Sequence, residues 1–148
     1  MTGDLTLVRR LAAADQGLAV ISTTRPDGTV HSSLVNAGVF DHPLTNEPTV
    51  AFVARAATQK MKLLAASGRA NAVFRAGWEW VSVEGPVDSI GPDHPRPGFP
   101  PEGIPALLRD IFTAAGGTHE NWTEYDRVMA EERRTAVFIS PARITTNN

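Results

Sequence analysis

The chain has 148 residues, 42% of them hydrophobic, and a formal net charge of −2. Its charges form no long block of one sign, which excludes the broad positive field that non-specific nucleic-acid binding requires. The absence of cysteine excludes disulfides, thiolate metal ligands and redox chemistry by protein sulfur. We expect a single domain over residues 1–148. It is expected to be cytoplasmic and without a membrane partner, because it has neither a signal-peptide core nor an apolar run of about 18 residues.

The beginning of the chain predicts a helix followed by a β-hairpin. Residues 4–15 have apolar side chains at helical spacing, with Asp4 placed to accept the first free amides. Residues 18–24 are rich in β-branched side chains and predict a strand. The sequence Arg-Pro-Asp-Gly at 25–28 is typical of a turn, and residues 29–35 resume as a strand.

The middle of the chain predicts further strands around a short helix. A loop with two prolines occupies residues 41–48. A helix over residues 58–67 is expected to be capped by Thr58 and closed by Gly68. The predicted strands of this region cover residues 49–54, 71–75 and 78–84.

The last third begins with five prolines and three glycines between residues 91 and 103, which predict an exposed loop. Helices are predicted over residues 104–115 and 122–132, and a last strand over 135–140. Hairpin signals require antiparallel neighbours, and no regular alternation of strand and helix appears. The fold class is therefore mainly β, a small antiparallel barrel with peripheral helices.

The segment that joins the third strand to the second helix has the residues of an anion site. Thr58 offers a hydroxyl at the helix start, where the first amides are unpaired, and Lys60 adds a full positive charge. The only two lysines of the chain, Lys60 and Lys62, both lie here. The same spacing also fits an ordinary capped surface helix with solvated lysines. The surrounding sequence is therefore needed to choose between an anion site and such a helix.

Four stretches of the chain carry a recognisable order and spacing. They are GLAVISTTRPDGTVHSSLVN (17–36) after the first helix, Thr58-Gln-Lys60, GWEWVSVEG (77–85), and WTEYD (122–126) followed by Arg133 and Arg134. In these stretches the chain resembles the pyridoxamine 5′-phosphate oxidase-like split-barrel family, and particularly its branch that binds coenzyme F420. The resemblance covers nearly the whole chain and implies a split β-barrel of the FMN-binding type.

The resemblance also implies a homodimer with two equivalent cofactor sites at the subunit interface. The charge distribution and the lack of a long apolar run, rather than the resemblance, predict that there is no nucleic-acid or membrane partner. The implied cofactor-binding residues are Thr58 and Lys60 at the phosphate, His31, Ser33 and Asn36 near the ring system, and Trp78 close to the same site from its own or the partner subunit.

Two positions depart from the family pattern. The F420 branch often has an arginine two residues before the helix lysine, where this chain has Thr58. The nearest arginine is Arg55, which is therefore the seventh candidate cofactor-binding residue. A glutamine is commoner at His31. A lone histidine on a strand is more often a surface or packing residue, although its pKa range suits proton transfer, so His31 is the one candidate catalytic residue. The four histidines lack metal-ligand spacing, and no metal site is expected.

Aromatic residues of the later segments have competing interpretations. Trp78 and Trp80 share one side of their strand, and we expect Trp80 in the core and Trp78 either there or at the cofactor. Structural roles are predicted for four residues near the end of the chain: Trp122 and Tyr125 in packing the last helices, and Arg133 and Arg134 in capping a helix or pairing with acids.

With neither a nucleophile nor a metal evident, the chemistry is expected to belong to a cofactor. The leading hypothesis is an F420-dependent oxidoreductase that transfers a hydride between reduced F420 and a small planar organic substrate. An FMN-binding oxidoreductase of the same fold is the enzymatic alternative, because its phosphate would use the same Thr58 and Lys60. Two hypotheses involve no catalysis: a carrier of a cofactor or haem, and a barrel that has lost its cofactor.

Overall fold

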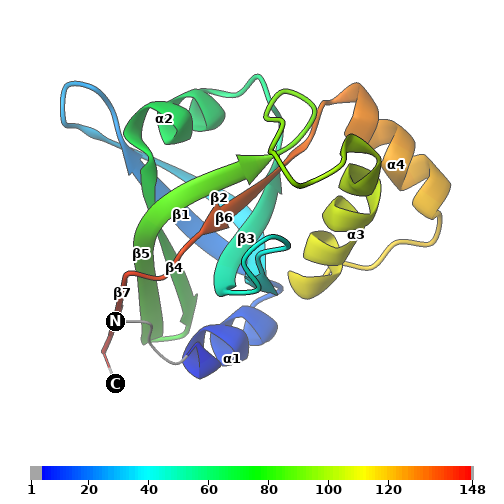
Figure 1. Cartoon of the computed structure of the whole chain (residues 1–148). Coiled ribbons are helices and arrows are strands. Elements are labelled where there is room, and N and C mark those ends of the chain that lie inside the picture. The colour runs from blue at the N-terminus through cyan, green and yellow to red at the C-terminus, as the bar shows by residue number, and fades with distance from the viewer. Residues whose placement is uncertain (1–4, 148) are drawn as a thin grey trace.

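The computed structural model describes residues 5–147 and shows a closed, six-stranded antiparallel barrel with one additional strand (Figure 1). The strands are β1 (Leu18–Thr24), β2 (Val30–Asp41), β3 (Pro48–Ala54), β4 (Arg69–Ala76), β5 (Glu79–Ile90), β6 (Thr135–Ile139) and β7 (Arg143–Thr146). Their hydrogen-bonded order is β4-β1-β2-β3-β6-β5-β7, and pairing of β4 with β5 closes the barrel. Strand β7, which the sequence did not predict, pairs with β5 outside the ring.

Two long strands divide the barrel into two sheets. Strand β2 pairs with β1 over residues 30–36 and with β3 over residues 37–41. In the same way β5 passes from β4 to β6 after Pro86. Just before this change stands Gly85, where a Cβ would lie 1.6 Å from the carbonyl oxygen of Ser140. The close approach of two backbones at this corner therefore requires glycine.

Four α-helices surround the barrel. They are α1 (Thr6–Ala14), α2 (Gln59–Ser67), α3 (Ile104–Ala114), which follows a 3₁₀ turn over Pro101–Gly103, and α4 (Trp122–Glu131). Figure 1 shows α1 and α2 at opposite ends of the barrel and α3 with α4 together at its side. None of the helices within residues 5–147 is long and apolar enough to cross a membrane.

The ends of α2 confirm the sequence prediction in detail. The Thr58 side chain accepts a hydrogen bond from the Met61 amide at 3.3 Å, and Gly68 closes the helix at φ 71°. Gly68 adopts this left-handed conformation without the steric cost that a Cβ would add. The predicted cap of α1, Asp4, lies outside the described residues.

The hydrophobic core has two parts, one inside the barrel and one between the barrel and α3 with α4. Strands β3 and β6 contribute to both, so Phe52 faces the interior of the barrel while Phe138 packs toward the helices. A strand that is buried on both faces has a continuous run of apolar residues, rather than apolar residues that alternate with polar ones. The two helices are thereby fixed against one wall of the barrel.

The structure confirms the predicted hairpin turn, in which the Arg25 amide donates to the Thr29 carbonyl at 2.7 Å. It extends β2 and β5 well beyond their predicted ends. The prediction that Trp80 lies in the core is wrong. Val81 and Val83 face the barrel interior from the other side of β5, which leaves Trp80 half-buried on the outer face.

Candidate cofactor-binding site

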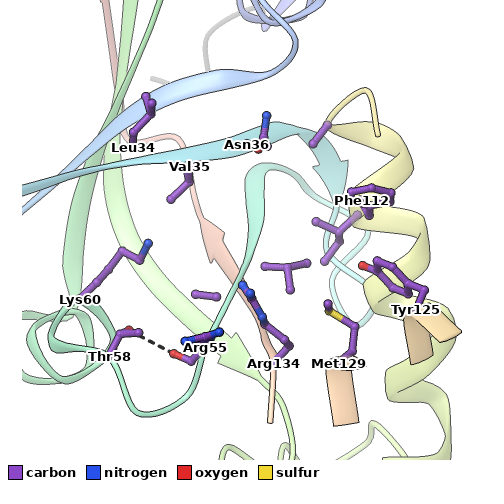
Figure 2. Close-up of a pocket in the computed structure, with 14 residues that line it drawn as sticks. Leu34, Val35, Asn36, Arg55, Thr58, Lys60, Phe112, Tyr125, Met129 and Arg134 are labelled. Carbon is purple, nitrogen blue, oxygen red and sulfur yellow. Dashed lines mark hydrogen bonds between the residues drawn. The ribbon is translucent and has the colours of Figure 1, made fainter. Parts of the chain in front are cut away.

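A cavity of about 380 Å³ opens between the barrel and α3 with α4. Its walls come from β2, the end of β3, the start of α2, and the two helices at the side. Figure 2 shows Arg55, Thr58 and Lys60 toward one end of the cavity, Phe112, Tyr125 and Met129 toward the other, and Arg134 between them. A ligand with one anionic end and one flat apolar end matches this division.

The charged end contains three cations and the start of a helix. It is formed by Arg55, Thr58, Lys60 and Arg134. Thr58 caps α2, whose first amides have no partner within the helix and whose dipole favours negative charge. Arg55, Thr58 and Lys60 lie in one stretch of six residues, whereas Arg134 comes from the segment before β6, so only the fold brings it to the other three.

Lys60 is a half-buried cation without an acid beside it. No residue within 5–147 forms an ion pair with its ammonium, and the charge that acts on it is the like charge of Arg134. Its Nζ lies 5.8 Å from the ring centroid of Phe52, a weakly favourable position. Burial, followed by repulsion from Arg134, lowers the pKa of Lys60. A bound anion would supply the negative charge that this site lacks.

Glu132 holds the other two cations. Its Oε2 accepts from Arg55 Nη2 at 2.7 Å and its Oε1 accepts from Arg134 Nε at 2.8 Å. These hydrogen bonds lower the pKa of Glu132 below its ordinary value. Three cations and one carboxylate leave a formal charge of +2 around this end of the cavity.

The opposite end is flat and apolar. Phe112, Tyr125 and Met129 line it, and the rings of Phe112 and Tyr125 are 5.1 Å apart between centroids. The Tyr125 hydroxyl donates to the Leu108 carbonyl at 3.2 Å, and burial raises the pKa of this phenol to about 12. Tyr125 therefore keeps its proton at neutral pH and presents a neutral ring to a ligand.

No protein-family model and no curated protein matches the chain by sequence. Solved structures match it in three dimensions. A conserved hypothetical protein from Mycobacterium tuberculosis superposes with a TM-score of 0.68 at 16% identity, over 97% of this chain and 84% of the other. An F420 reductase matches with a TM-score of 0.61 at 14% identity, over 89% of this chain and 91% of the other.

A pyridoxamine 5′-phosphate oxidase-related, FMN-binding protein from Nostoc punctiforme matches with a TM-score of 0.64 at 12% identity, over 95% of this chain and 79% of the other. The chain has the FMN-binding split-barrel fold. Identities of this size establish the fold of the barrel and not its ligand.

The split barrel brings together four of the seven predicted cofactor-binding residues. Asn36, Arg55, Thr58 and Lys60 all line the cavity. The Asn36 amide nitrogen already donates to the Gln16 carbonyl at 2.8 Å, so its remaining hydrogen-bonding capacity is its oxygen and second N–H.

The predicted residues His31 and Ser33 do not line the cavity. They share the inward face of β2 with Val35, which does line it, but they lie nearer the start of the strand than the cavity reaches. His31 Nδ1 and Ser33 Oγ are nevertheless buried without a hydrogen-bond partner among the described residues. Such atoms are expected to gain a partner when a ligand or water binds.

Trp78 lies outside the cavity of its own barrel. It is 94% exposed and borders a separate surface hollow with Trp80, Val73 and Arg75. Contact between Trp78 and a cofactor held by a partner subunit stays a prediction.

Arg134 is the main site residue that sequence reasoning missed. Both neighbouring arginines were expected to cap a helix or pair with acids, and Arg133 does pair with Asp93 while Arg134 pairs with Glu132. Arg134 also lines the cavity, because β6 runs beside β3 in the sheet. The order of the strands is not encoded in any local pattern, so only the barrel reveals this proximity.

Proposed function

We propose that this split barrel is an F420-dependent oxidoreductase that transfers a hydride between reduced F420 and a small planar organic substrate. The observation that carries the proposal is one cavity with a cationic end at Thr58 and Lys60 and an aromatic end at Phe112 and Tyr125. An F420 reductase and an FMN-binding protein among the similar structures support a cofactor of this kind. FMN is the alternative cofactor.

The residues present fit such a group at both ends. Lys60, Arg55 and Arg134 would hold the phosphate, and the Thr58 cap leaves the first amides of α2 directed at it. Phe112 and Met129 would exclude water from the ring system. Reduced F420, when bound, supplies a hydride from the carbon that replaces the central flavin nitrogen. The protein contributes binding, orientation and a dry cavity.

The test is a fluorescence titration with oxidised F420 and, in parallel, with FMN. Lys60→Ala is expected to weaken binding about 10- to 100-fold, because a hydrogen bond to a charged group contributes roughly 1.5–3 kcal/mol. Lys62→Ala on the same helix is the matched control, since Lys62 is exposed and outside the cavity. Binding of neither ligand by the wild-type protein would refute the proposal, and preference for FMN would replace F420 with the flavin.

A non-catalytic carrier is the second candidate. One observation favours it: the hydroxyl of Tyr125, a residue of the cavity wall, already donates to the Leu108 carbonyl, and its raised pKa makes it a poor proton donor to a substrate. Anaerobic oxidation of reduced F420 by a planar acceptor, followed by absorbance, separates the two. Turnover beyond one equivalent would refute the carrier.

We further propose that the protein is a homodimer. The outer face of β1 and β2 exposes Val20, Val30 and Leu34, with exposed fractions of 42%, 58% and 62%. Val20 and Leu34 lie opposite one another in the strand register, and Leu34 also borders the cavity. A second copy on this face would cover apolar side chains and lie beside the cofactor. Light scattering measures the oligomeric state of the wild type and of Leu34→Asp. A monomeric wild-type protein would refute the proposed homodimer.

A further inference from the structure

We propose that Glu132 is a specificity-determining residue, which sets how strongly the cavity prefers a phosphate-bearing ligand over the same ring system without phosphate. This inference rests on the proposed function, because it concerns the anion that the cavity would hold. Glu132 does not line the cavity itself. It acts through Arg55 and Arg134, which do.

Glu132 is placed rigidly by the end of α4. The Arg134 amide donates to the Met129 carbonyl at 2.9 Å and the Arg133 amide to the Ala130 carbonyl at 3.2 Å. Arg133 adopts the left-handed conformation at φ 49° between them. This pair of bonds is the Schellman ending of a helix, and it turns the chain directly into β6. Glu132 and Arg134 are thereby held on either side of one fixed turn.

The carboxylate divides its two oxygens between the two arginines. Each guanidinium donates a hydrogen bond to one carboxylate oxygen, at 2.7 Å from Arg55 and 2.8 Å from Arg134. Neither oxygen accepts a hydrogen bond from Lys60. The Glu132 side chain is 25% exposed, so solvent screens its charge only in part. With Glu132 ionised, the three cations and one anion sum to +2. Without the carboxylate charge the same end of the cavity would carry +3.

An incoming phosphate therefore competes with Glu132 for both arginines. The carboxylate orients the two guanidinium groups, but it also repels the phosphate that they would bind. Removing its charge while keeping an acceptor oxygen leaves at least one arginine held in place. The affinity for phosphate is then expected to rise, whereas a residue with a purely structural role would lower the affinity or leave it unchanged when altered.

The test compares Glu132→Gln with the wild type in titrations of FMN and riboflavin, and of F420 and its chromophore without the phosphodiester tail. At low salt we expect the phosphate-bearing ligand to bind about tenfold more tightly to the variant, the effect of one nearby unit charge. The ligand without phosphate should bind the two proteins equally. Rising salt should shrink the gain.

Glu131→Gln is the matched control, because it removes the same charge one residue earlier. The Glu131 side chain is 63% exposed and pairs with Arg127 rather than with the cavity. Its binding constants should equal those of the wild type. Circular dichroism of each variant shows that the fold is retained.

The outcomes separate this inference from the proposed function. Tighter phosphate binding by Glu132→Gln alone supports the inference. Equal or weaker binding overturns it, and leaves the proposed function standing if Lys60→Ala still weakens wild-type binding. Failure of both the wild type and Glu132→Gln to bind any of the four ligands overturns both.

Discussion

Replacing Arg134 with methionine is expected to weaken binding of a phosphate-bearing cofactor, whereas changing the adjacent arginine is not. Arg134 lines the cavity and Arg133 points to Asp93 on the protein surface. Methionine keeps an unbranched side chain and removes the charge. Arg133→Asn is the matched control, because asparagine tolerates the left-handed conformation at φ 49°.

The expected magnitude follows from the charges around the site. Loss of one charge-assisted hydrogen bond costs roughly 1.5–3 kcal/mol, or about 10- to 100-fold in the dissociation constant. One opposing effect lowers this figure, since Lys60 is released from repulsion by Arg134 and its own charge becomes easier to keep. We therefore expect the lower end of the range, about tenfold.

Two measurements check the reasoning. Fluorescence titration gives the affinity for FMN or F420, and NMR of the lysine side chains gives their pKa values, with only Lys60 and Lys62 to resolve. The pKa of Lys60 should rise in Arg134→Met and stay unchanged in Arg133→Asn. An unchanged Lys60 pKa, or cofactor affinity equal to the wild type, would refute the assignment of Arg134 to this site.

Two further predictions concern stability. Gly85→Ala should lower the free energy of unfolding by about 3 kcal/mol in urea titrations, because the new Cβ meets the Ser140 backbone, which is tied to Pro86 at 2.9 Å. Gly77 has open space around it but a φ of 61°, so Gly77→Ala should lower the free energy of unfolding by only about 1 kcal/mol. If both variants lost the same free energy of unfolding, the close backbone contact at Gly85 would not be the cause. The single tyrosine, Tyr125, should ionise near pH 12 in ultraviolet titration. Because the pKa of Tyr125 is raised from 10.0 in the folded protein, its contribution to stability is complete below about pH 10 and falls as the pH rises toward 12. Ionisation near pH 10 in the folded protein would show that the phenol is not buried.

Local patterns predicted the elements whose causes are local. The Asp-Gly turn after β1 and the Thr58 cap with Gly68 depend on side chains within a few residues, and each is present as expected. The extensions of β2 and β5 were missed because a strand that changes partners mid-length has no sharp sequence boundary. Trp80 was misplaced because alternation gives two faces without saying which one is inside.

The sequence by itself determined the mainly β class and the capped start of α2, since turn residues, β-branched runs and a helix cap act over short distances. The tertiary structure alone decided which cations share the cavity. Arg134 reaches Lys60 only because β6 pairs with β3, and Glu132 joins Arg55 across 77 residues of chain. Contacts of such long range depend on the order of strands in the closed barrel, which no local pattern encodes.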